Sequence, residues 1–120
     1  MLTSTGGFPP FVQLGYGTGT AWYKESDSGL NSDLVEATKT AVGLGFHHLD
    51  GAEVYCTEPE LGKAIQDCGV AREKLFITTK VNQNVSDIPA ALNASLEKLG
   101  LEYVDLYVFS LCCPDSLAQQ

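Results

Sequence analysis

The stretch GFHHLDGAEVYCTEPELG, residues 45–62, decides the fold predicted for this chain. It begins with a short apolar run, residues 46–49, and reaches an acid, Asp50, where the run stops. Thr57, Glu58 and Pro59 then predict a helix start, because proline is tolerated in the first turn. A strand that ends on an acid and leads through a loop into a helix is the βα unit of an α/β protein. Functional groups in such proteins gather at the carboxyl ends of the strands.

Strands and helices are predicted to alternate on both sides of this unit. Short β-rich segments predict strands at residues 15–20, 46–50, 74–80 and 103–109. Helices are predicted at residues 31–44, 58–67 and from about 88 to Gly100, with Asn31 or Ser32 as the first cap and Asp87 opening the last helix. Apolar residues at helical spacing predict the buried faces, which are Leu34, Ala37, Ala41 and Leu44, then Leu61, Ala64 and Ile65, then Ile88, Leu92, Leu96 and Leu99. This order implies right-handed parallel βαβ crossovers.

Composition excludes several classes of protein. Seven Lys and Arg against fifteen Asp and Glu give a net charge of −8, which argues against a nucleic-acid-binding surface. The four cysteines lie at spacings that match no zinc pattern, so no metal site is expected. No stretch approaches the roughly 20 apolar residues of a membrane span, and the first residues lack the features of a signal peptide. We therefore expect a soluble cytoplasmic protein that does not bind membranes.

The same central stretch resembles the first signature of the aldo-keto reductase family. The matching positions are Gly45, Phe46, His48, Leu49, Asp50, Ala52, Tyr55, Glu58 and Gly62. LGYGTGTAWYK before it and ITTKV after it agree in order and spacing. HLDGAE together with GTGTAW is most similar to the fungal ketoreductase branch of that family.

The resemblance implies a fold class, an α/β (β/α)8 TIM barrel, of which this chain covers only part. Such a barrel typically needs about 250 residues, and the chain has 120. We expect residues 1–120 to form the N-terminal half of an NADP-dependent oxidoreductase domain. It would comprise an N-terminal loop or hairpin at residues 3–14, about four βα units, and an irregular tail at residues 110–120. We expect the chain to be a truncated product.

Three polar residues are expected to project from one end of the predicted sheet. Asp50 ends one strand, Lys80 ends the next, and Tyr55 lies in the loop that follows Asp50. Each of them alone is better interpreted as a structural acid, a solvated lysine or an exposed loop aromatic. Their order within matching motifs favours a functional group of three.

The resemblance implies a role for each of the three. Tyrosine is a weak acid, with an unperturbed pKa of about 10, and a neighbouring cation makes its proton easier to release. Tyr55 would be the general acid in carbonyl reduction, Lys80 would assist it, and Asp50 would anchor Lys80. A nicotinamide cofactor, NADPH, would supply the hydride. The partner would be a small-molecule ketone or aldehyde.

The resemblance also implies cofactor contacts near the first strand. Gly19, Thr20 and Ala21 match the exit of the family's first strand, which together with Asp50 lies on the nicotinamide side; Gly17 and Thr18 are an alternative register. Trp22 and Tyr23 either line a substrate pocket or cover the loop.

One member of the family's catalytic set has no counterpart here. The family's catalytic histidine would fall at Ser110, which can donate a single hydrogen bond. His47 and His48 are expected in the second strand on opposite faces, with His48 a hydrogen-bonded core residue.

Two functions of different classes follow from these patterns. The first is an NADPH-dependent reductase of carbonyl compounds. The alternative is a truncated, non-catalytic fragment, a pseudoenzyme or splice product, that lacks the histidine and most cofactor contacts. In either case four parallel strands would leave unpaired edges, through which the chain could self-associate.

Overall fold

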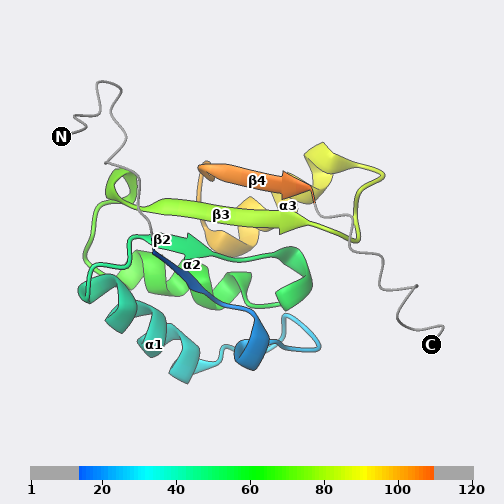
Figure 1. Ribbon diagram of the computed structural model, residues 1–120. Helices are drawn as coiled ribbons and strands as arrows, with labels where there is room; N and C mark the ends of the chain where they lie inside the picture. The colour runs from blue at the N-terminus through cyan, green and yellow to red at the C-terminus, as the bar shows by residue number, and fades with distance from the viewer. Residues whose placement is uncertain (1–13, 110–120) are drawn as a thin grey trace.

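The computed structural model describes residues 14–109 (Figure 1). The predicted hairpin before Leu14, the tail at residues 110–120 and Ser110 lie outside this range. The strands are β1 (Gly15–Gly17), β2 (His48–Asp50), β3 (Phe76–Val81) and β4 (Leu106–Phe109). The α-helices are α1 (Ser32–Gly43), α2 (Glu58–Asp67) and α3 (Ile88–Leu99). Three short 3₁₀ turns join them, η1 (Thr20–Trp22), η2 (Glu53–Tyr55) and η3 (Arg72–Lys74).

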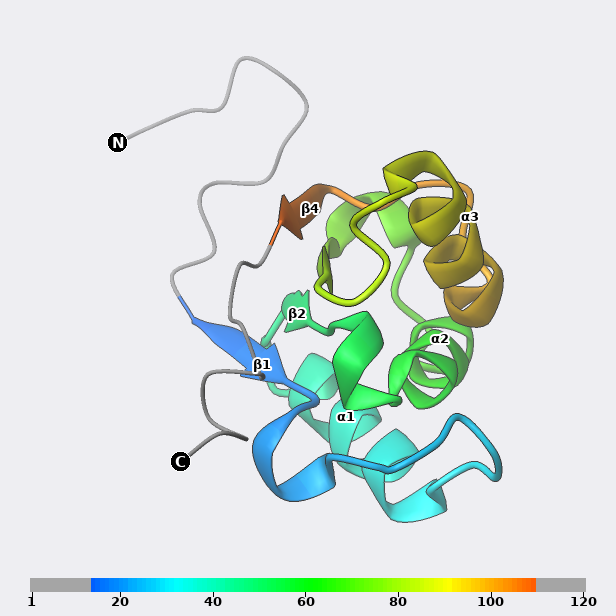
Figure 2. The same cartoon turned by 90° about the vertical axis from the view of Figure 1, so that its right-hand side faces the viewer.

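The four strands form one parallel sheet in the order β1-β2-β3-β4. All three α-helices lie on one side of this sheet, with α2 between α1 and α3 (Figure 2). Within the described residues, β1, β2 and β3 are each followed by a helical segment that returns the chain to the start of the next strand. The structure therefore confirms the predicted parallel α/β fold, an arrangement that places every strand's carboxyl end at the same edge.

Local sequence signals determine where the helices begin. The side chain of Asn31 accepts hydrogen bonds from the backbone N–H groups of Asp33 (3.1 Å) and Leu34 (3.2 Å), so Asn31 caps α1. Asp87 caps α3 in the same way, through the N–H of Ala90 at 3.1 Å. The bounds of α2 agree with the predicted 58–67.

Strand starts are less well predicted. The second strand begins at His48 and not at residue 46, because the N–H of Phe46 still bonds to the carbonyl oxygen of Ala41 at the end of α1 (3.0 Å). His47 therefore precedes the strand in which it was expected. His48 lies in β2, where its Nε2 pairs with the hydroxyl of Thr78 at 3.0 Å, and it is half-buried rather than part of the core.

The core lies between the sheet and the helices. Its buried cluster comprises Val42, Leu49, Leu61, Ile65, Leu75, Ile77 and Leu99. Two predicted helix faces are wrong in part. Leu44 is 75% exposed, because α1 ends before it. In α3 the buried row is Ala91, Ser95 and Leu99. Of the residues predicted to be buried there, Ile88 is exposed, and Leu92 and Leu96 lie one position further round the helix and are half-buried.

A buried glutamate lies at the start of α2. The Glu58 side chain is 1% exposed, and its Oε1 accepts a hydrogen bond from the hydroxyl of Thr79 at 2.5 Å. Among the described residues its Oε2 has no hydrogen-bond partner. Burial raises the pKa of the Glu58 carboxyl, although the hydroxyls of Thr79 and Ser95 act in the opposite direction.

Replacing Glu58 with glutamine should therefore change how stability depends on pH. A carboxyl whose pKa is higher in the folded state stabilises the fold fully below its unfolded pKa of ~4.3, and that contribution is lost as pH rises through the folded pKa. Because glutamine is neutral throughout, we expect the stability of Glu58→Gln relative to wild type to increase between pH 4 and pH 8. Urea denaturation over this pH range measures the difference. Glu36→Gln, which changes an exposed glutamate, should show no such trend.

Candidate active site

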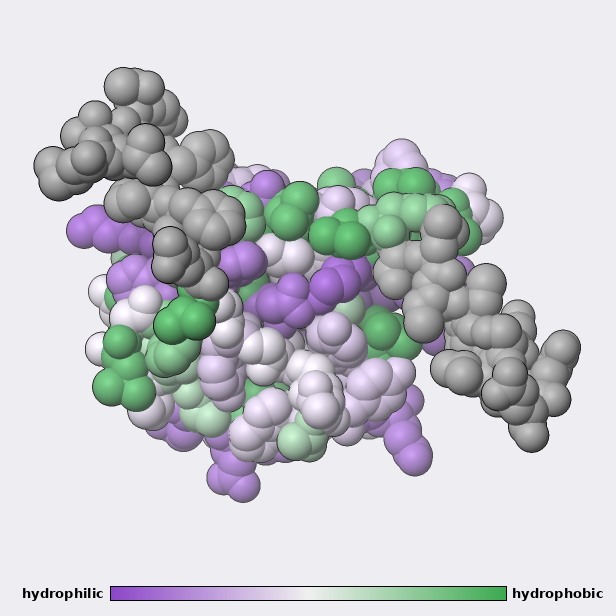
Figure 3. Space-filling model, in the orientation of Figure 1, coloured by the Kyte–Doolittle hydropathy of each residue, from purple (hydrophilic) through white to green (hydrophobic). Residues whose placement is uncertain are grey.

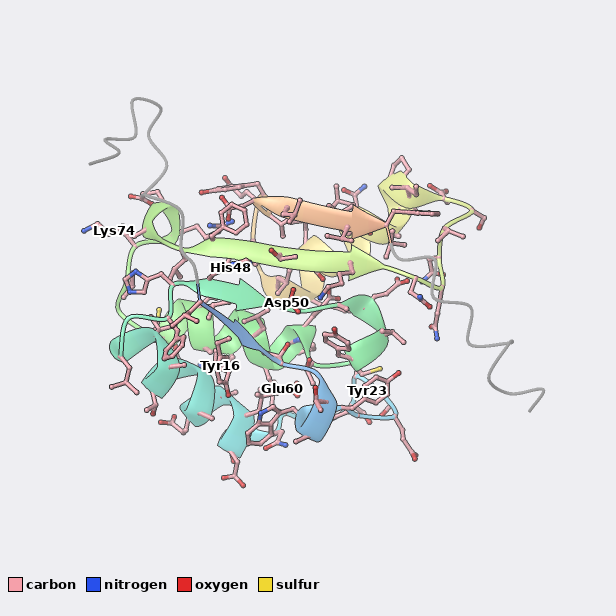
Figure 4. All side chains as sticks on the ribbon, in the orientation of Figure 1. Tyr16, Tyr23, His48, Asp50, Glu60 and Lys74 are labelled. Atoms are coloured by element: carbon pink, nitrogen blue, oxygen red, sulfur yellow. The ribbon has the colours of Figure 1, made fainter. Side chains whose placement is uncertain are left out.

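An ion pair joins the carboxyl ends of two neighbouring strands. Asp50 is the last residue of β2 and lies opposite Thr78 in β3, which places Lys80 two residues further along the same face. The Nζ atom of Lys80 donates to Oδ2 of Asp50 at 2.6 Å and to the carbonyl oxygen of Gly51 at 2.9 Å. Asp50 lies toward the carboxyl end of its strand and His48 toward the amino end (Figure 4). The pair is thus held by strand register.

Tyr55 completes the group of three. It is the last residue of η2, which begins two residues after β2 and turns the chain back over the strand ends. Its hydroxyl lies 3.4 Å from Nζ of Lys80, and the same nitrogen lies 5.0 Å from the centroid of its ring. The structure therefore brings together Asp50, Tyr55 and Lys80, which the sequence placed at the same edge of the sheet.

Gly19 packs directly against the ring of Tyr55. A Cβ atom at Gly19 would lie 2.9 to 3.1 Å from three carbon atoms of that ring, so only glycine fits without displacing the tyrosine. Thr20 and Ala21, the other residues predicted to contact a cofactor, are exposed on η1 beside it. Of the four residues predicted to bind the cofactor, Gly19 therefore contacts the predicted proton donor, Thr20 and Ala21 follow it on the surface, and Asp50 is bonded to Lys80.

Gly17 and Thr18 were the alternative register for the cofactor contacts. Of these two residues, Thr18 has a structural role. The Thr18 side chain is fully buried, and its hydroxyl and backbone N–H both bond to the carbonyl oxygen of Asp50, at 3.1 and 3.0 Å. Thr57 in turn donates to the carbonyl oxygen of Thr18 at 2.9 Å. These bonds fasten the exits of β1 and β2 to the start of α2.

The site is accessible from the face of the sheet that the helices leave open. The side chains of Lys80 and Asp50 are 22% and 33% exposed. Hydrophilic residues lie across the middle of this face, with hydrophobic residues along β4 (Figure 3). Tyr23 stands edge-on to Tyr55, with ring centroids 6.2 Å apart, at the rim of the same site (Figure 4).

Sequence reasoning missed Glu53. This residue begins η2, and its carboxylate accepts four hydrogen bonds from residues 82–84. Its position in GAEVY, two residues before Tyr55, was the one available signal. The partners are about 30 residues away along the chain, beyond the reach of any local pattern.

The structure also has a surface groove, which lies away from the candidate active site. Its volume is about 560 Å³, and it lies between α2 and α3, on the helix side of the sheet. None of the three residues of the candidate site lines it.

Over residues 14–109, no helix is both long and apolar enough to cross a membrane.

Comparisons with known proteins show which family the chain resembles in sequence. The model of the aldo/keto reductase family matches residues 13–116. The chain is 50% identical over 93 residues to an NAD/NADP-dependent indole-3-acetaldehyde reductase of Schizosaccharomyces pombe, covering 78% of this chain and 33% of that protein. It is 44% identical over 98 residues to an NADPH-dependent alpha-keto amide reductase of Saccharomyces cerevisiae, covering 77% of this chain and 31% of the relative.

Solved structures of aldo-keto reductases are also similar to this chain. A Bombyx mori aldo-keto reductase in complex with NADP superposes with a TM-score of 0.68 at 37% identity, covering 80% of this chain and 33% of that one. An aldo/keto reductase from Brucella melitensis gives 0.64 at 37% identity, covering 79% of this chain and 35% of that one. The chain thus spans about a third of the length of the relatives that it matches.

Proposed function

This chain belongs to the aldo/keto reductase family, and from that premise we propose that it acts in the NADPH-dependent reduction of a ketone or aldehyde to an alcohol. The observation that carries the proposal is the contact of the Tyr55 hydroxyl with the Lys80–Asp50 ion pair, at 3.4 Å. A phenol beside a fixed cation can act as the general acid that protonates a carbonyl oxygen.

Each of the three residues has a separate task in this proposal. Tyr55 donates its hydroxyl proton to the carbonyl oxygen of the substrate as that oxygen gains negative charge. Lys80 stabilises the phenolate that remains, because its ammonium group lies within hydrogen-bond distance of the oxygen. Asp50 keeps the ammonium in place through the 2.6 Å ion pair. Asp50 and Lys80 are placed by the ends of their strands and Tyr55 by the turn η2, so the three groups are in position before the reaction begins.

Gly19, Thr20, Ala21 and Asp50 are the residues that we propose to contact the nicotinamide end of NADPH. Two observations support this role. Thr20 and Ala21 are exposed, and Gly19, which precedes them, packs against the ring of Tyr55 without a side chain that would cover it. The bound cofactor supplies the hydride. The names of the relatives include NADPH and NAD/NADP, which supports a nicotinamide cofactor, and we propose NADPH as the preferred form.

The proposed substrate class is a small carbonyl compound. One relative is named for indole-3-acetaldehyde and another for alpha-keto amides. Both are small molecules with a reactive carbonyl group, which a site at the end of a parallel sheet can hold. We also propose a cytoplasmic location, since Cys56 and Cys68 are free thiols, as is usual in a reducing compartment.

We propose in addition that the chain self-associates through the edges of its sheet. Within residues 14–109, β1 and β4 each pair with a single strand. Leu106 and Phe109 of β4 are 45% and 47% exposed. An exposed strand edge with apolar side chains favours pairing with another chain.

Fluorescence titration of the purified chain with NADPH, alongside its mass in solution, tests the proposed function. We expect saturable binding with a Kd in roughly the micromolar range, weaker binding of NADH, and a mass above that of the monomer. The absence of saturable binding up to about millimolar NADPH would contradict the enzymatic proposal and favour the non-catalytic alternative.

A further inference from the structure

The carboxylate of Glu53 gathers three consecutive backbone N–H groups. Its Oε1 atom accepts hydrogen bonds from the backbone of Asn82 at 2.7 Å, Gln83 at 2.6 Å and Asn84 at 3.2 Å. Its Oε2 atom accepts from Nδ2 of Asn84 at 3.0 Å. Successive N–H groups that converge on one point form an anion-binding concavity, and here the anion belongs to the protein itself.

These bonds join the two segments that carry the candidate catalytic residues. Glu53 begins η2, which ends at Tyr55, and Asn82 follows the last residue of β3, two positions after Lys80. Figure 2 shows the segment after β3 running beside η2. The carboxylate therefore bridges these segments just beyond the point where the Tyr55 hydroxyl meets Nζ of Lys80.

We propose that Glu53 is a positioning residue, which fastens residues 82–84 to η2 and so holds the Tyr55 hydroxyl beside Nζ of Lys80. The importance of Glu53 for turnover rests on the proposed reductase function. Its role in holding Tyr55 beside Lys80 does not depend on that function. Tyr55 lies on a single 3₁₀ turn, whose few hydrogen bonds hold it weakly. Its carbonyl oxygen accepts one bond from outside the turn, from the backbone N–H of Lys24 at 3.1 Å, and the bonds of Glu53 attach the other end of the turn to the segment after Lys80.

The ionisation of Glu53 is consistent with this role. Burial on its own raises the pKa of the carboxyl, but the hydrogen bonds from Asn82, Gln83 and Asn84 outweigh it and lower the pKa below its usual value. Glu53 is therefore negatively charged at neutral pH. Charge-assisted hydrogen bonds of this kind are stronger than neutral ones, so a single residue can hold the whole segment.

Three variants of the whole chain test the inference. Glu53→Ala removes the carboxylate, Glu53→Gln keeps its shape but loses its charge, and Glu53→Asp keeps the charge on a shorter stem. The matched control is Glu36→Gln, which removes an exposed charge on α1. Circular dichroism first establishes that each variant is folded; if Glu53→Ala is not, Glu53→Gln takes its place.

Two NMR measurements then distinguish positioning of Tyr55 by Glu53 from mere support of the loop at residues 82–84. Amide hydrogen exchange at residues 82–84 should become roughly tenfold faster or more in Glu53→Ala, and less so in Glu53→Asp. The nuclear Overhauser effect between the Tyr55 ring protons and the Lys80 side-chain methylene next to Nζ should weaken in the same order. Faster exchange with an unchanged Tyr55–Lys80 signal would overturn the proposal, because Glu53 would then support only the loop. Unchanged exchange would overturn it as well.

Kinetics adds a readout that depends on the proposed function. If the wild type reduces a carbonyl compound with NADPH, kcat of Glu53→Ala should fall by roughly 10- to 100-fold with KM for NADPH little changed. If the wild type has no activity, the proposed function fails, while the NMR measurements still decide whether Glu53 positions Tyr55. A normal kcat in Glu53→Ala would refute the positioning role directly.

Discussion

Tyr55→Phe should reduce the rate of carbonyl reduction by at least roughly 100-fold, the lower end of the contribution that a positioned general acid makes. The substitution removes one oxygen atom, the one that lies 3.4 Å from Nζ of Lys80. The phenylalanine ring would still fill the space against Gly19, so the loop should keep its conformation. We therefore expect kcat to fall while the Kd for NADPH stays close to that of the wild type. Carbonyl-dependent NADPH oxidation and fluorescence titration measure the two quantities.

Tyr103→Phe is the matched control for this experiment. It removes the same atom from a tyrosine that is 46% exposed and whose ring packs against the guanidinium group of Arg72, 4.0 Å from its centroid. Because that contact uses the ring and not the hydroxyl, activity should be unchanged. Equal activity of Tyr55→Phe and the wild type would show that another group donates the proton.

Gly62→Ala should lower the free energy of unfolding by about 2 kcal/mol. A Cβ atom at Gly62 would lie 2.4 Å from the carbonyl oxygen, 2.7 Å from the carbonyl carbon and 2.8 Å from Cα of Leu99. All three are backbone atoms, so α2 and α3 would have to separate. Because backbone atoms cannot move aside as a side chain can, we expect a cost at the upper end of the range for overpacking, about 3 kcal/mol. The higher helix propensity of alanine offsets about 1 kcal/mol of this cost. For a domain of this size we expect the Tm to fall by about 10 °C.

Gly43→Ala provides the control, since Gly43 is also helical but has nothing within 4 Å of the position its Cβ would take. There alanine should be neutral or should raise stability by up to about 1 kcal/mol. Thermal and urea denaturation followed by circular dichroism give both values. Should the two substitutions have the same effect, the close approach of α2 to α3 would not exist in solution.

The sequence by itself determined the order of the elements and the end of the sheet that carries the polar residues. Apolar periodicity and capping residues are local signals, so α2 was predicted with its bounds and Asn31 was one of two predicted caps. The spacing of Asp50, Tyr55 and Lys80 sufficed to place them together, because parallel strands bring all their carboxyl ends to one edge. The family also followed from the sequence, through matches spread over residues 14–81.

Tertiary structure alone decided several of the buried positions and which distant groups are joined. Ala91 and Ser95 line the buried row of α3 in place of Leu92 and Leu96, since close packing on a neighbouring element selects by available space as well as by hydrophobicity. Glu58 and Glu60 are buried in a helix that would otherwise leave them in water, where Thr79 and Lys24 reach them from other segments. The bridge from Glu53 to residues 82–84 is of the same kind. Hydrogen bonds between residues far apart in the chain depend on strand register and loop path, which are set by the whole fold and not by any local stretch of sequence.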